Sequence, residues 1–116
     1  MRLTKDELKE LSLDELKELL GAEFRKMRVD VMIDSPNKVA KAANISHKTI
    51  YNLEAGSHIP TKRTLQRILW VYRASEEDVD YVIELANLAR KKRSTEIKER
   101  QELEEKINKM MGARKI

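Results

Sequence analysis

The amino-acid sequence predicts an all-α fold, a bundle of short helices followed by a helical extension. Only three Gly and two Pro occur in 116 residues, which disfavours long loops and a fold of many strands. Apolar residues recur at steps of three and four along most of the chain, as they do on one face of a helix. Ser or Thr stands three residues before an acidic residue at several places, which is typical of a helix N-terminus.

The first two helix starts lie close together, at Thr4 and at Ser12. The second opens a long amphipathic helix that is expected to end before Asp34. Pro36 is expected to be the first residue of the next helix, with Ser35 as its cap, because Pro fits the first helical position. The predicted apolar stripe of the long helix is Leu13, Leu16, Leu20, Phe24, Met27 and Val31.

The centre of the chain predicts two short helices joined by a tight turn. The first runs for about eight residues from Pro36. Asn44 tolerates a left-handed backbone and Ser46 can cap the second helix, which is expected over 47–55 and ends at Gly56. The residues expected to face inward are Val39, Ala40, Ala43, Ile45, Ile50 and Leu53.

Three further helices are predicted. One follows Pro60 and has an apolar face of Leu65, Ile68, Leu69 and Tyr72. A second is expected over 76–93, opened by Ser75 with Asp78, and a highly charged third over 95–111.

Charge is unevenly distributed along the chain. Residues 21–74 carry ten Lys and Arg against four Asp and Glu, a net charge of +6, whereas 1–20 carry −2 and 75–116 are neutral. A basic central segment is typical of a module that faces phosphates. The same charges fit solvated helix faces equally well.

Several kinds of site are disfavoured. Without Cys there are no disulfides, thiolate metal ligands or cysteine nucleophiles, and the two His residues lack zinc-site spacing. The glycines are isolated, so no glycine-rich loop can hold a phosphate. Neither a signal peptide nor a membrane-spanning run is seen. We therefore expect a cytoplasmic protein that is not an enzyme and has no cofactor, metal site or membrane partner.

A spaced set of residues across the two central helices carries a resemblance to a known family. It consists of Val39-Ala40, Asn44-Ile45-Ser46, Ile50, Glu54 and Gly56, followed by Pro60 and Leu65. Over roughly residues 16–72, this pattern resembles the Cro/lambda-repressor (Xre) family of DNA-binding domains. The resemblance implies a lambda-repressor-like helix-turn-helix bundle, with the motif at about 36–55 and the second motif helix in the major groove of duplex DNA.

The resemblance also implies site residues. Those expected to face bases are His47, Lys48, Tyr51 and Asn52, and those expected to touch phosphates are Ser46, Thr49, Lys62 and Arg63. Each of them also fits an ordinary solvated or packing role. Glu54 is expected to be structural, paired with Arg28. The chain departs from the family where Pro36 replaces a usual Gln, and where Met32 or Ile33 stands near a usual turn glycine.

The C-terminal third suggests a homodimer. The helix expected over 76–93 has two apolar stripes, one of Val79, Val82, Ile83 and Ala86, and an opposed one of Tyr81, Leu85 and Leu88. A surface helix needs only one such stripe, so the second is expected to meet the last helix of the same chain or a second subunit. A narrow seam follows at Leu103, Ile107, Met110 and Met111, beside the spaced pairs Glu96–Arg100, Glu102–Lys106 and Glu105–Lys109.

The predicted organisation is therefore a short N-terminal helix (1–12), a helix-turn-helix DNA-binding domain (13–74) and C-terminal dimerisation helices (75–116). The predicted function is a transcriptional regulator, a repressor that recognises a palindromic operator. The alternative is an antitoxin or coactivator-type protein-interaction module with the same fold. The basic run Arg90-Lys91-Lys92-Arg93 fits either a phosphate clamp or a cation-rich helix C-terminus.

Overall fold

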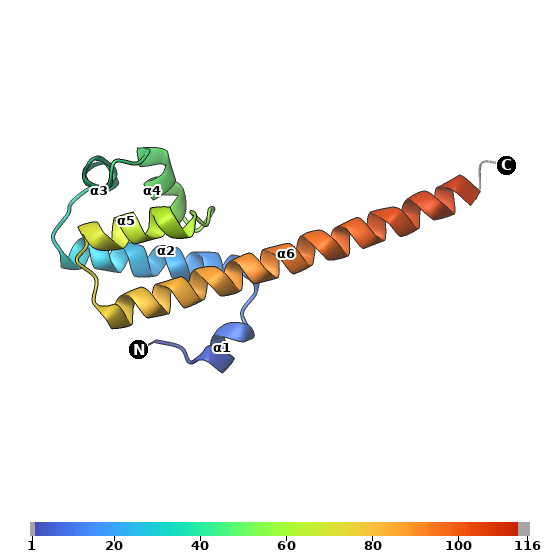
Figure 1. The fold of residues 1–116 in the computed structure, drawn as a ribbon, viewed down its shortest axis with the longest axis horizontal. Helices are drawn as coiled ribbons and strands as arrows, with labels where there is room; N and C mark the ends of the chain where they lie inside the picture. The colour runs from blue at the N-terminus through green and yellow to red at the C-terminus, as the bar shows by residue number, and fades with distance from the viewer. Residues whose placement is uncertain (1, 114–116) are drawn as a thin grey trace.

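The computed structural model describes residues 2–113. This part of the chain is all-helical and contains no strand, as the sequence predicts (Figure 1). Its six helices are α1 (Lys5–Lys9), α2 (Leu13–Asp30), α3 (Pro36–Ala43), α4 (His47–Glu54), α5 (Lys62–Val71) and α6 (Glu76–Ala113). The end of α6 projects far beyond the bundle that the other helices form, so the molecule measures 66 × 32 × 19 Å.

Capping boxes begin α1 and α2, as predicted. The hydroxyl of Thr4 accepts from the backbone N–H of Glu7 at 3.3 Å, and the Glu7 carboxylate accepts from the N–H of Thr4 at 3.1 Å. Ser12 and Glu15 make the same exchange, with both distances at 3.1 Å. Each box satisfies two of the backbone N–H groups that a helix start leaves unpaired.

The turn between α3 and α4 is built as the sequence predicts. Asn44 adopts the left-handed conformation, with φ 55° and ψ 51°, and the N–H of Ile45 donates to the carbonyl of Ala40 at 3.0 Å. The Ser46 hydroxyl then caps α4 by accepting from the N–H of Lys48 at 3.3 Å. α3 does begin at Pro36, but Ser35 makes no side-chain cap bond.

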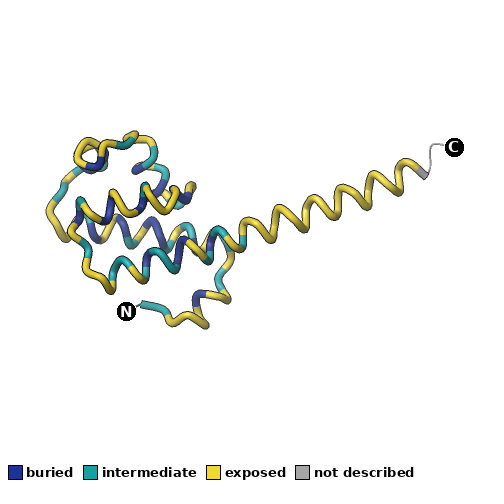
Figure 2. The backbone as a smooth tube through the Cα atoms, in the orientation of Figure 1, coloured by how far each residue is buried: buried dark blue, intermediate teal, exposed yellow. Residues whose placement is uncertain are grey.

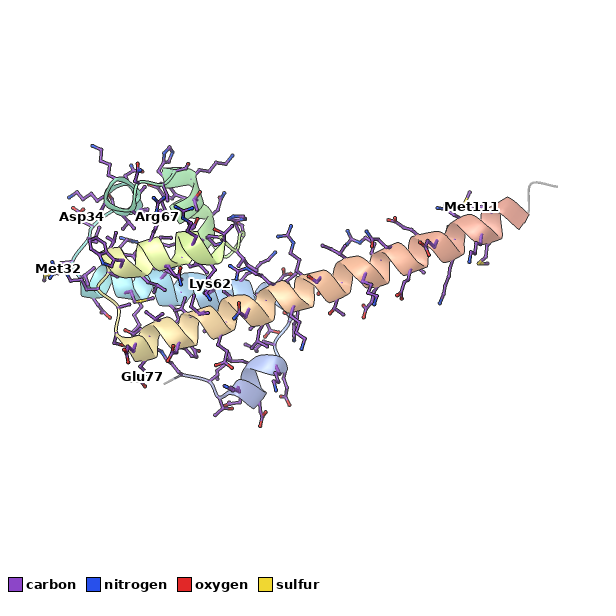
Figure 3. All side chains as sticks on the ribbon, viewed as in Figure 1. Met32, Asp34, Lys62, Arg67, Glu77 and Met111 are labelled. Atoms are coloured by element: carbon purple, nitrogen blue, oxygen red, sulfur yellow. The ribbon has the colours of Figure 1, made fainter. Side chains whose placement is uncertain are left out.

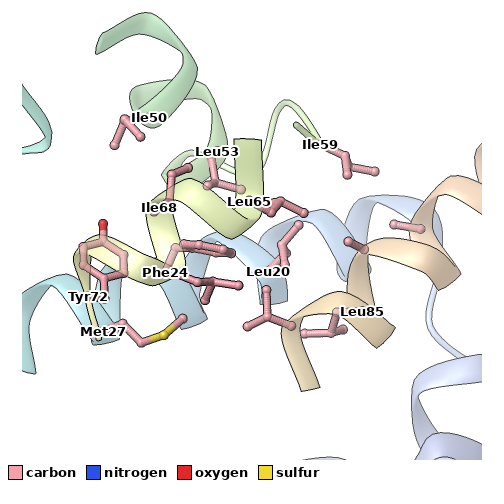
Figure 4. Packing of buried hydrophobic residues seen from close by; sticks show 14 of the residues in the cluster. Leu20, Phe24, Met27, Ile50, Leu53, Ile59, Leu65, Ile68, Tyr72 and Leu85 are labelled. Carbon is pink, nitrogen blue, oxygen red and sulfur yellow. The ribbon is translucent and has the colours of Figure 1, made fainter. Parts of the chain in front are cut away.

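The core is organised around α2. Leu16, Leu20 and Phe24 are fully buried, and the Phe24 ring centroid lies 6.3 Å from that of Tyr72 on the end of α5 (Figure 4). Burying an apolar side chain of this size contributes about 1.5–3 kcal/mol. The other helices add the buried residues Leu8, Val39, Ile50, Leu53, Leu65, Ile68, Val82 and Leu85. Val31, predicted as the last residue of the α2 stripe, is instead exposed because α2 ends at Asp30.

Besides Asn44 at the end of α3, two further helix ends adopt a left-handed conformation without glycine. Met32 follows α2 with φ 61°, at the place where the resembled family has its turn glycine, and Arg73 follows α5 with φ 50°. In the first of these turns the N–H of Ile33 donates to the carbonyl of Arg28 at 3.1 Å. This backbone arrangement is the usual helix-ending turn, for which glycine is the preferred residue.

The two C-terminal helices predicted at 76–93 and 95–111 are one continuous helix, α6. No Gly or Pro interrupts the chain between them, and the hydroxyl of Thr95 donates to the carbonyl of Lys91 at 3.0 Å inside the helix. Residues 93–112 are exposed along their whole length (Figure 2). At about 1.5 Å per residue they form an arm roughly 30 Å long.

The stripe of Tyr81, Leu85 and Leu88 was expected to meet the last helix or a second subunit, but it packs against the core of the same chain. Leu85 is fully buried against the chain's own core, together with Val82, Ala86 and Ala89. The N-terminal segment covers the other side of α6: the Arg2 guanidinium lies 4.6 Å from the centroid of the Tyr81 ring and pairs with Asp78 at 2.5 Å. Both apolar stripes are therefore at least partly covered within one chain.

Candidate nucleic-acid interface

The outer face of α4 brings together the residues predicted to face bases. His47, Lys48 and Tyr51 are exposed, and Thr49 and Asn52 are partly exposed, whereas Ile50 and Leu53 point into the core. The rings of His47 and Tyr51, four residues apart, meet edge to face with centroids 6.2 Å apart. This contact restrains two side chains on the exposed surface.

A shallow groove of about 920 Å³ runs beside α4 towards α3. It collects Ser46, His47 and Tyr51 from the predicted set, and it adds Asn37, Lys38 and Lys41 from α3. Those three residues were missed in the sequence, although the spacing of Lys38 and Lys41 places both on the outer face of a predicted helix. Lys38 lies 2.8 Å from Asp34, and this hydrogen bond lowers the pKa of the Asp34 carboxyl.

Lys62 and Arg63 open α5 and are exposed, with Thr61 as the cap. Lys62 lines a different hollow from the α4 groove, and Lys5, Gln66 and Lys91 also line it. Neither Lys62 nor Arg63 lines the groove beside α4.

The inner side of α4 is held by an ion pair, as expected. The Arg28 guanidinium binds both carboxylate oxygens of Glu54, with Nε–Oε2 and Nη2–Oε1 distances of 2.9 Å. The Glu54 side chain is 7% exposed and that of Arg28 is 13% exposed, so the pair is largely shielded from water. The bond to Glu54 raises the pKa of Arg28 above its usual value.

Further hydrogen bonds add to the Arg28–Glu54 ion pair in holding α4 against α2. Arg28 also donates to the carbonyl of Ile33 at 3.0 Å, and Arg25 donates to the backbone carbonyl of Glu54 at 2.9 Å. Burial, with the nearby charge of Glu54, raises the pKa of the Tyr72 hydroxyl. α4 is therefore fixed to α2 by charge-assisted bonds at its C-terminal end, while its N-terminal end stays accessible.

Half of the basic run on α6 has a structural role. The Arg90 guanidinium donates to the carbonyl of Pro60 at 2.5 Å, and the Lys92 ammonium donates to the carbonyl of Lys9 at 2.8 Å and to that of Leu11. These bonds tie the loop before α5 and the end of α1 to α6. The run does not lie at a helix C-terminus, because α6 continues to Ala113.

Within residues 2–113, His, Asp and Glu side chains form no group of three or more that could hold a metal ion. None of the helices in this range has the length and apolar composition needed to cross a membrane.

The motif formed by α3 and α4 agrees with a comparison against known families. A family model described as a helix-turn-helix domain matches residues 19–82, which is more than half of the chain. The match extends about ten residues beyond the segment in which the sequence pattern was found, into the first turns of α6. No curated protein and no solved structure matches the chain. The protein belongs to the helix-turn-helix domain family, which supports DNA binding.

Proposed function

We propose that the protein is a sequence-specific transcriptional regulator of the Cro/lambda-repressor type, and not an enzyme, that places α4 in the major groove of DNA. The observation that carries this proposal is the outer face of α4, which exposes His47, Lys48 and Tyr51 while its only acidic residue, Glu54, is buried and paired. An α-helix of this kind fits the major groove, where base edges are distinguishable.

The proposed base contacts are His47, Lys48, Tyr51 and Asn52. Asn52 carries the side chain best suited to a single base, because its amide can bond the adenine edge at two atoms. Ser46, Thr49, Lys62 and Arg63 are proposed to touch phosphates, and the groove beside α4 supports adding Lys38 and Lys41. A protein that acts by occupying its operator represses most directly by blocking access to it.

We further propose that two copies bind a palindromic operator, held together by the exposed arm of α6. Leu103, Ile107 and Met110 follow one another at steps of four and three residues, which is coiled-coil spacing, and each is about half exposed or more. The described arm shows no ion pair at Glu96–Arg100, Glu102–Lys106 or Glu105–Lys109. A second arm would supply the packing that a solitary helix lacks.

DNA binding is tested by selecting bound sites from random duplex DNA and measuring affinity for the selected site. With Lys38, Lys41, Lys62 and Arg63 from each of two subunits near phosphates, we expect affinity to fall about 10³-fold or more between 50 and 200 mM salt. Asn52→Ala should weaken binding to the selected site by about 1–3 kcal/mol. Lys26→Ala, an exposed change on α2, is the control and should leave base preference unaltered. Failure to enrich any sequence would reject the proposal.

The arm is tested by sedimentation of the wild type and of the double variant Leu103→Asp/Ile107→Asp. We expect a dimer for the wild type at tens of micromolar, and a folded monomer with much weaker operator affinity for the variant, because neither side chain is part of the core. Gln101→Asp, on the same arm, is the matched control and should remain dimeric. A monomeric wild type, or an unchanged dimer in the double variant, would contradict this role of the arm.

A further inference from the structure

The most exposed aromatic side chain lies near the C-terminal end of α5, at the other end of the helix from Lys62 and Arg63. Trp70 is the only tryptophan of the chain and is 80% exposed. It borders an open hollow of about 650 Å³ where the end of α5 meets α3 and the first turn of α6. The residues that line this hollow, which we call the Trp70 groove, are Ala42, Gln66, Leu69, Trp70, Val71, Arg73, Ala74 and Val79.

The Trp70 groove has a basic rim and an apolar floor. Arg73 is the only charged residue in its lining, and Arg67 stands one turn before Trp70 on α5 (Figure 3). The exposed residues of α5 include Lys62, Arg63 and Arg67 and no acidic residue. Trp and Arg are the residue types that contribute most to protein–protein interfaces, and an exposed apolar surface beside them is typical of such a site.

This groove is distinct from the groove beside α4, although it shares Gln66 and Val79 with the hollow that Lys62, a proposed phosphate contact, lines. It shares no lining residue with the groove beside α4. On α3, Ala42 lines the Trp70 groove, whereas Lys38 and Lys41 line the other one. It is also distant from the proposed dimer contact, because α5 packs on the first half of α6 and the seam ends at Met111 on the far tip (Figure 3).

We infer that the Trp70 groove is a docking site for an acidic, amphipathic segment of a partner protein, which it can hold while α4 is on DNA. The inference goes beyond the proposed function, which does not require a protein partner. An apolar side chain of the segment packs on the indole ring and on Val71 and Val79. Carboxylates on either side bind the guanidinium groups of Arg67 and Arg73, whose planar fork matches a carboxylate.

The single tryptophan provides a readout located in the groove itself. The probe is a synthetic amphipathic peptide without tryptophan, with Leu and Phe on one face and Glu elsewhere, added to the full-length protein. We expect Trp70 emission to move to shorter wavelength and to saturate, with binding that weakens as salt is raised. The same peptide with Lys in place of Glu should produce no shift. An absence of shift with the Glu peptide up to millimolar concentration would overturn the inference.

Variants and DNA distinguish the remaining outcomes. Arg73→Glu should weaken peptide binding at least about tenfold, whereas Lys98→Glu, the same charge change on the exposed arm, should not. The affinity for the peptide should be unchanged when the selected operator is bound. If operator DNA itself shifts Trp70 emission and the peptide displaces it, the groove belongs to the DNA interface. If instead the Trp70 emission wavelength changes with protein concentration, and the double variant Leu103→Asp/Ile107→Asp abolishes that change, a second copy of the chain fills the Trp70 groove. Either result would overturn the inference.

Discussion

Replacing Glu54 with Ala is expected to lower the free energy of unfolding by about 3–5 kcal/mol, the range found when one partner of a buried ion pair is removed. The Arg28 guanidinium would lose both of its 2.9 Å bonds to the carboxylate while remaining largely buried. Arg28 could not regain full hydration without leaving its bond to the carbonyl of Ile33. The loss therefore comes mainly from an uncompensated charge.

Denaturant unfolding of Glu54→Ala and Asn52→Ala measures this effect, since both changes truncate one polar side chain of α4. Asn52 lies on the partly exposed side, and its loss should cost less than about 0.5 kcal/mol. The double variant Arg28→Met/Glu54→Leu should regain most of the stability, because no charge is left unpaired. Equal losses for the two single variants would show that the pair does not hold α4.

The helix-turn-helix part of the fold could be predicted because its determinants are local. Asn44 fixes the turn, Ser46 caps α4 and Gly56, with φ 75°, ends it, each within a few residues of the feature it sets. The pairing of Arg28 with Glu54 is a long-range contact that periodicity cannot reveal. It was anticipated only from the resemblance to a family.

The errors in the C-terminal third have a long-range cause. The pattern of α6 shows two apolar stripes, but it does not show that residues 2–9 lie across one of them. The free surface is decided by three contacts of the N-terminal segment: Arg2 with Tyr81, Leu8 with the core, and the carbonyls of Lys9 and Leu11 with Lys92. Among the site residues, Lys62 lines a hollow that is shared with α6, and its phosphate contact stays a prediction.

Replacing Gly21 with Ala is expected to destabilise the protein and to weaken operator binding together. Gly21 lies on α2 where the end of α4 crosses it, and a Cβ there would stand 2.5 Å from the carbonyl oxygen of Leu53 and 2.8 Å from that of Glu54. Backbone atoms cannot move aside as easily as the end of a flexible side chain. The Glu54 carbonyl also accepts a hydrogen bond from Arg25. α4 must therefore move outward, at a cost of about 1–3 kcal/mol.

The same substitution at Gly112 is the matched control. Both glycines lie within helices, so both changes remove similar freedom from the unfolded chain and gain up to about 1 kcal/mol of helix propensity. No atom lies within 4 Å of a Cβ at Gly112, so there the gain is unopposed. We expect a lower unfolding midpoint and weaker operator affinity for Gly21→Ala, and unchanged or increased helicity with unchanged affinity for Gly112→Ala. A Gly21→Ala protein as stable as the wild type would show that α4 does not rest on α2 at this contact.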